Sequence, residues 1–142
     1  SFGTAEQVLE ITSRVNHALV GVSYSLGAAV IAGEDPVRGL TRLGKKLFVA
    51  RVKDVKAGRL VALGEGELGC ERFVRALASQ GFEGPLVYEW DRAWEVAGGG
   101  EALAGPDAVL GRASRLMFEW AAKERGTGAS AAMAGGVRSG RG

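Results

Sequence analysis

The sequence contains one cysteine and one histidine among its 142 residues. A single cysteine cannot form a disulfide within the chain, which favours a reducing compartment such as the cytoplasm. A single histidine leaves too few nitrogen ligands for a zinc centre that uses several histidines. His17 precedes the first predicted strand, on the rim opposite the one where sites form in parallel sheets. We therefore interpret it as a solvated loop residue.

The sequence also lacks long apolar runs and a clear excess of either charge. No run has the length that spans a membrane, and the first residues show no secretory signal pattern. The two surplus positive charges come from Arg138 and Arg141, so residues 1–125 are neutral. Nucleic-acid binding needs clustered basic charge. We therefore expect no nucleic-acid partner and no membrane partner.

What the chain does contain is an alternation of strand and helix patterns. Thr4 and Gln7 match a capping box, which marks a helix start. Asp35 and Pro36 mark another, because Asp caps a helix and Pro suits its first position. The patterns predict strands over 19–24, 47–52 and 85–89, and helices over 4–15, 36–43 and 71–80 and from 106 onward. Residues 55–68 and 91–105 are expected to be loops, and residues 60–63 are a candidate for extended backbone within the first.

One helix followed by three strand–helix units predicts an α/β fold with parallel strands and right-handed crossovers. A complete eight-unit barrel needs about 250 residues, so this chain cannot close one alone. It begins at Ser1 without a methionine, which we expect of a fragment or a processed product. In parallel sheets, sites form beyond the carboxyl ends of the strands, here 25–29, 51–56 and 89–94.

Several short motifs occur in a fixed order. Val52-Lys53-Asp54 is followed by Leu63-Gly64-Glu65-Gly66-Glu67, and Gly81-Phe82-Glu83-Gly84-Pro85 then leads into Leu86-Val87-Tyr88-Glu89-Trp90. This order resembles the C-terminal part of the sugar phosphate isomerase/epimerase family, the xylose isomerase-like TIM barrels. The resemblance implies that residues 1–125 are the C-terminal portion of a (β/α)8 barrel. Residues 126–142, rich in Gly, Ala and Ser, are expected to be a disordered tail.

The resemblance also identifies replaced metal ligands. Relatives read Asp-x-Gly-His where this chain has Ser25-Leu26-Gly27-Ala28, and His-x-Lys-Asp where it has Arg51-Val52-Lys53-Asp54. Glu89 is the one family ligand retained, and a fourth, another Glu, belongs to a strand before Ser1. In the family a divalent ion (Mn, Mg, Co or Zn) holds two adjacent sugar oxygens while carboxylates move the proton. One carboxylate cannot hold such an ion, so we expect no metal in this chain.

The resemblance implies roles for five residues. Glu89 is the catalytic candidate and the doubtful metal ligand, and the substrate-binding candidates are Ser25, Arg51, Lys53 and Trp90. Arg51 is expected either to pair with Glu89, replacing the charge of the metal, or to face solvent at a strand end. Trp90, with nearby Trp94, is expected either to stack on a sugar ring or to pack against a helix.

Other candidates have simpler interpretations. Glu65 and Glu67 lie in a glycine-rich loop that either only turns the chain or reaches the site. Gly64-Glu65-Gly66 is too short for a nucleotide fingerprint, and Cys70 is interpreted as a small buried residue.

The implied parent function is the interconversion of aldoses and ketoses, or of epimers, with a sugar or sugar acid as the small-molecule partner. We expect this chain alone to be inactive. The alternative is a non-catalytic sugar-binding or structural homologue. A zinc endonuclease of the related DNA-repair branch is disfavoured by the single histidine and the neutral body. The remainder of the barrel or a homo-oligomer is the expected protein partner.

Overall fold

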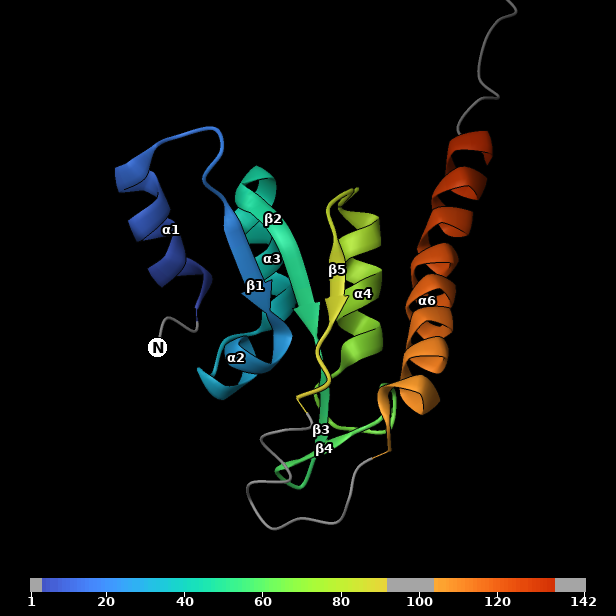
Figure 1. Ribbon diagram of the computed structural model, residues 1–142. Coiled ribbons are helices and arrows are strands. Elements are labelled where there is room, and N and C mark those ends of the chain that lie inside the picture. Colours follow the sequence, from blue (N-terminus) through green and yellow to red (C-terminus); the bar gives the residue numbers. More distant parts are fainter. Residues whose placement is uncertain (1–3, 92–103, 135–142) are drawn as a thin grey trace, which may run out of the picture.

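The computed structural model describes residues 4–91 and 104–134 (Figure 1). The elements in chain order are α1 (Ala5–Val15), β1 (Val22–Ser25), α2 (Leu26–Ile31), α3 (Pro36–Leu43), a 3-10 turn (Gly44–Lys46), β2 (Leu47–Val52), β3 (Asp54–Lys56), β4 (Arg59–Val61), α4 (Cys70–Ser79), β5 (Leu86–Tyr88) and α6 (Pro106–Ala134).

The described strands form two sheets. β1, β2 and β5 make a parallel sheet in that order, with Ser25 opposite Arg51 and Arg51 opposite Val87. β3 and β4 form a separate antiparallel hairpin beyond the end of β2. The parallel strands connected through α3 and α4 confirm the predicted α/β fold with parallel strands, its βα units preceded by a helix.

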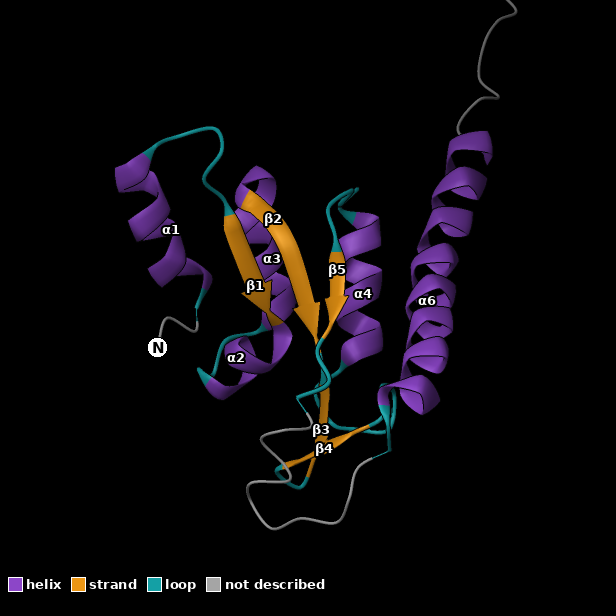
Figure 2. Ribbon diagram, in the orientation of Figure 1, coloured by secondary structure: helices purple, strands orange, loops and turns teal. Residues whose placement is uncertain are grey.

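Helices cover one face of the parallel sheet. Figure 2 shows α3 and α4 behind the three strands and α6 beside α4. Ala50 and Val52 of β2 are buried against Leu40 of α3 and Phe73 of α4 within one core cluster. Residues alternate along a strand, so Arg51 lies on the other face, which no described helix covers in this view. In a complete barrel that face lines the interior.

The helix starts follow the predicted capping chemistry. Thr4 caps α1 by accepting a hydrogen bond from the N–H of Gln7, and the Gln7 side chain accepts from the N–H of Thr4, which completes the capping box. Asp35 caps α3 by accepting from the N–H of Val37 at 2.9 Å, and Pro36 follows at the first helical position. Both helices therefore begin at the positions that these capping residues predict.

The sequence patterns do not predict α2 and indicate only part of the hairpin β3–β4. α2 is only six residues long, so its sequence shows no helical period. The hairpin β3–β4 covers residues 54–61, so it begins one residue before the predicted loop 55–68 and overlaps the candidate extended stretch 60–63, and it turns at Ala57 and Gly58, both with positive φ. Two-residue hairpin turns of this kind usually carry Asn-Gly, so Ala-Gly gave a weak signal.

The last helix is longer than expected. α6 continues to Ala134, so residues 126–134, assigned from composition to a disordered tail, are helical, and residues 135–142 lie outside the described part. The division of the chain into barrel portion and tail stays a prediction. Within the described residues, no helix combines the length and the apolar character that crossing a membrane requires.

Candidate functional site

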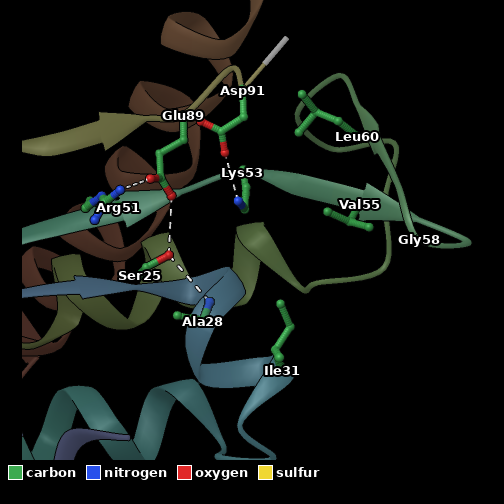
Figure 3. Close-up of a pocket in the computed structure, with 10 residues that line it drawn as sticks. All are labelled: Ser25, Ala28, Ile31, Arg51, Lys53, Val55, Gly58, Leu60, Glu89 and Asp91. Atoms are coloured by element: carbon green, nitrogen blue, oxygen red, sulfur yellow. Dashed lines mark hydrogen bonds and ion pairs between the residues drawn. The ribbon is translucent and has the colours of Figure 1, made fainter. Parts of the chain in front are cut away.

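A cavity of about 730 Å³ opens at the carboxyl edge of the parallel sheet (Figure 3). β1, β2 and β5 all end there, and α2 and the hairpin β3–β4 form its other walls. The lining residues are Ser25, Ala28, Ile31, Arg51, Lys53, Val55, Gly58, Leu60, Glu89 and Asp91. The cavity therefore lies where parallel sheets place their sites.

The central contact of the cavity is an ion pair between Arg51 and Glu89. Arg51 Nη2 donates to Glu89 Oε1, and Ser25 Oγ donates to Glu89 Oε2 at 3.3 Å. The three side chains come from three neighbouring strand ends, as Figure 3 shows. Both oxygens of the Glu89 carboxylate are thus engaged by this chain's own donors.

Ser25 has a second role that fixes its position. It is the N-cap of α2, and its Oγ accepts a hydrogen bond from the N–H of Ala28 at 3.5 Å. The strand β1 passes directly into α2 at this residue, so the hydroxyl is held at the cavity edge by the helix start. Ala28 itself lines the cavity with only a methyl group, which leaves space in front of the ion pair.

A second ion pair lies beside the first. Lys53 Nζ donates to Asp91 Oδ2 at 2.8 Å. The stem of Lys53 crosses Gly27, where a Cβ would come within 3.0 Å of Lys53 Cε. The absence of a side chain at Gly27 therefore allows Lys53 to lie along α2 and reach Asp91. Asp91 was missed by the sequence analysis, although its spacing of two from Glu89 is the signal that could have found it.

Asp54, the first residue of β3, binds the backbone of the loop next to the cavity. Its side chain is 2% exposed, and its carboxylate accepts hydrogen bonds from the backbone N–H groups of Val55, Gly64, Gly66 and Leu68. This one carboxylate therefore organises the glycine-rich loop that carries Glu65 and Glu67. Glu65 pairs with Arg112 of α6, and Glu67 is exposed; neither residue lines the cavity.

The groups around Asp54 are held in their neutral forms. Burial, and then the charge of Asp54 and a hydrogen bond to it, raise the pKa of the Cys70 thiol. Its Sγ donates to the carbonyl oxygen of Lys53 at 3.3 Å, so the interpretation of Cys70 as a small buried residue is confirmed. Burial also raises the pKa of Tyr88 to about 12. Cys70 and Tyr88 therefore belong to the packed core and not to the cavity lining.

The family model of the xylose isomerase-like TIM barrels matches residues 1–116. The chain belongs to this family. The predicted resemblance is confirmed by this match, which covers most of the chain. No curated protein sequence matches the chain significantly.

Solved structures agree on the fold of this xylose isomerase-like chain. It is similar to a xylose isomerase domain protein from Planctomyces limnophilus, at 22% identity and a TM-score of 0.65 over 87% of this chain and 45% of that one. It is also similar to a D-allulose 3-epimerase from Methylomonas sp., solved with D-allulose, at 17% identity and a TM-score of 0.69 over 82% of this chain and 42% of that one. It is similar, too, to an L-ribulose 3-epimerase, at 14% identity and a TM-score of 0.73 over 97% of this chain and 47% of that one. The chain spans less than half the length of each of these relatives.

The structure brings four of the five predicted site residues of this xylose isomerase-like chain together. Ser25, Arg51, Lys53 and Glu89 all line the cavity. Trp90 does not line it. Its ring packs beside that of Tyr88, with centroids 6.1 Å apart, and its Nε1 donates to the carbonyl oxygen of Ala104 at 3.1 Å. A part for Trp90 in substrate binding stays a prediction, and Trp94 lies outside the described residues.

The donor set present does not fit the divalent metal that the family implies. Hard divalent cations take several oxygen ligands, whereas Glu89 already accepts from Arg51 and Ser25. Within the part of the chain that the structure describes, no three His, Cys, Asp or Glu side chains are grouped to hold a metal ion. The guanidinium of Arg51, a fixed positive charge, instead lies against the carboxylate.

Proposed function

We propose that this chain forms the C-terminal part of a barrel of the sugar isomerase and epimerase type, and that its cavity binds a sugar or sugar acid. One observation carries the proposal: Ser25, Arg51 and Glu89, from three neighbouring strand ends, converge on one cavity. Hydrogen-bond donors and acceptors thereby lie side by side, which is the arrangement that adjacent hydroxyl groups of a sugar require.

Each polar side chain has a distinct part in this binding. The guanidinium of Arg51 carries five N–H donors, so pairing with Glu89 leaves donors for a carbonyl or hydroxyl oxygen of the ligand. Lys53 supplies an ammonium group beside it. The carboxylate of Glu89 accepts hydrogen bonds from ligand hydroxyls, and Ser25 fixes its orientation through the 3.3 Å contact.

Catalysis by this chain alone is not part of the proposal. Isomerisation or epimerisation by proton transfer requires a base that removes a proton from carbon. Glu89 is the catalytic candidate that the family resemblance supplies, but both of its oxygens accept hydrogen bonds from the chain itself. We therefore expect binding without turnover. The alternative, a purely structural homologue, predicts no sugar binding at all.

Calorimetric titration of the full chain with a ketohexose, a ketopentose and an aldonate tests the proposal. At least one sugar is expected to bind, and Arg51→Gln is expected to weaken that binding by about tenfold, equivalent to about 1.4 kcal/mol. Arg42→Gln is the matched control, because Arg42 pairs with Glu6 on the helix side of the molecule and does not line the cavity. No heat with any sugar, or an equal loss in both variants, overturns the proposal.

A further inference from the structure

The charges that line the cavity balance. Two cations, Arg51 and Lys53, face two carboxylates, Glu89 and Asp91, so the described lining carries no net charge. Each cation contacts one carboxylate, in the pairs Arg51–Glu89 and Lys53–Asp91. The hairpin cations Lys56 and Arg59 are exposed and do not line the cavity.

The two pairs form a ladder across two strand ends. Arg51 and Lys53 are two residues apart in sequence, as are Glu89 and Asp91, so each set shares one side of its strand. The register places Arg51 opposite Val87, and Arg51 reaches the carboxylate two residues further on. Figure 3 shows both contacts on the same side of the cavity.

An anionic ligand meets an unfavourable arrangement here. A phosphate or carboxylate group is recognised by cations that are free to give charge-assisted hydrogen bonds. Here each cation already contacts a carboxylate, so an added anion has to displace that carboxylate or lie close to it. Two like charges about 4 Å apart repel each other even at the dielectric constant of water, and they repel more strongly when partly buried.

An uncharged sugar meets no such repulsion. Each hydroxyl group both donates and accepts, so neighbouring hydroxyls can donate to Glu89 or Asp91 and accept from Arg51 or Lys53 without separating either pair. The ladder repeats every two residues, which offers alternating donors and acceptors along one side of the cavity.

Apolar residues line two other parts of the cavity. In Figure 3, Ile31 of α2 lies below the ion pairs, and Val55 and Leu60 of the hairpin lie to their right. Ile31 is 86% exposed and borders the open space. Apolar surface of this kind favours a ligand edge made of C–H groups, because contact removes both surfaces from water.

We propose that the cavity selects an uncharged sugar, with its hydroxyl groups on the Arg51–Glu89 and Lys53–Asp91 ladder and a C–H edge against Ile31 and Val55. Sugar phosphates and sugar acids are the ligands it disfavours. This inference rests on the proposed function and narrows its ligand class.

The test compares a ketohexose, its 6-deoxy analogue and its 6-phosphate, with an aldonate of equal length, by calorimetric titration of the full chain. The uncharged ketohexose is expected to bind about tenfold more tightly than its phosphate or the aldonate. The 6-deoxy analogue is expected to bind at least as tightly as the parent sugar.

Asp91→Asn separates charge from shape, because it leaves Lys53 without its carboxylate partner. It is expected to strengthen binding of the phosphate by about fivefold and to weaken binding of the uncharged sugar. Glu83→Gln is the matched control: it also removes one negative charge, from an exposed residue that does not line the cavity, and it is expected to change neither.

Tighter binding of the phosphate or the aldonate by the unmodified chain overturns this inference and leaves the proposed function standing. Equal responses of Asp91→Asn and Glu83→Gln also overturn it. Binding of no sugar, charged or uncharged, overturns both.

Discussion

The two residues of the Arg51–Glu89 ion pair differ in how far their side chains are exposed to solvent. The side chain of Glu89 is 9% exposed, whereas that of Arg51 is 43% exposed. Solvent screens the arginine, so the attraction within the pair is moderate. A buried carboxylate that loses its partner, however, keeps the full cost of its desolvation. The stability of this site therefore depends mainly on keeping Glu89 paired.

This asymmetry predicts the outcome of a mutant cycle. Arg51→Ala should lower the free energy of unfolding by about 1–3 kcal/mol, because Glu89 is left charged and buried. Combining Arg51→Ala with Glu89→Gln should restore part of that loss, since the amide carries no charge. Urea unfolding of the two single variants and the double variant measures the effect. A double variant less stable than Arg51→Ala contradicts the expectation.

Stability at high pH depends on three other residues. Burial, then a hydrogen bond to Glu34 and its charge, raise the pKa of Tyr24; burial and Asp54 raise that of Cys70; and burial raises that of Tyr88 from 10.0 to about 12. All three are neutral when protonated, so the unfolded chain releases these protons at lower pH than the folded chain. Their contribution to the free energy of unfolding is complete below the unfolded-chain pKa values, 9.0 for Cys and 10.0 for Tyr. That contribution is lost as pH rises through the folded-state pKa values.

The free energy of unfolding should therefore be level to about pH 8.5 and fall above it. The fall above pH 10 should be shallower in Tyr88→Phe, which removes one titrating group. Urea unfolding at a series of pH values to 11 provides the measurement. Stability that rises between pH 9 and 11 contradicts the assignment of all three groups.

At the element scale, the loop after the hairpin depends on a single carboxylate. Asp54 binds four backbone N–H groups of residues 55–68, and Gly66 is so close that a Cβ there would lie 2.1 Å from Asp54 Oδ1. A side chain at position 66 would therefore overlap the Asp54 carboxylate, so only glycine fits there without a shift. The loop in turn holds the hairpin that forms one wall of the cavity, through the N–H of Glu67, which donates to the carbonyl oxygen of Val55 at 2.8 Å.

Gly66→Ala should consequently lower the free energy of unfolding by about 1–3 kcal/mol, since the Asp54 contacts must break or shift. Gly105→Ala is the matched control, because open space surrounds Gly105 and its φ is not in the left-handed region. Thermal unfolding of both variants decides the point. Equal melting temperatures would show that the Asp54 contacts do not hold the loop.

The same elements show what a sequence can and cannot specify. β2 was predicted to the residue, because Leu47 to Val52 is apolar except for Arg51 and is bounded by lysines. The Arg51–Glu89 contact was one of two expectations for Arg51, the other being a side chain that faces solvent, and the sequence alone does not decide between them. The sequence does not predict the partner of Lys53, because the position of its ammonium group depends on the space above Gly27. The family resemblance makes Trp90 a candidate together with Glu89, whereas neighbouring residues on extended backbone point to opposite sides.

At the scale of the whole molecule, the sheet is open on one face. Val87 of β5, opposite Arg51, is 42% exposed, and the apolar residues Ile11 and Val15 of α1 are exposed as well. The end strands β1 and β5 each pair with β2 alone among the described strands, which leaves backbone groups available for another strand. This fits a chain that spans less than half of its structural relatives.

The isolated chain is therefore expected to self-associate or to require the remainder of a barrel. Size-exclusion chromatography with light scattering should show dimers or larger assemblies, and Val87→Lys on the open face should reduce them. Phe118→Lys is the control, because Phe118 is 74% exposed on α6, the helix that lies beside α4 in Figure 2. A sharp monomer peak with cooperative unfolding would contradict this expectation.

The central claim is that the cavity binds a sugar without a metal, with Arg51 in place of the cation. The most direct measurement is calorimetric titration of the chain with an uncharged ketohexose, first in EDTA and then in Mn²⁺. The account predicts dissociation constants that agree within a factor of about two, and no stoichiometric binding of Mn²⁺ alone. Binding that appears only with Mn²⁺, and that disappears in Glu89→Gln, would contradict the account and restore a metal-dependent isomerase.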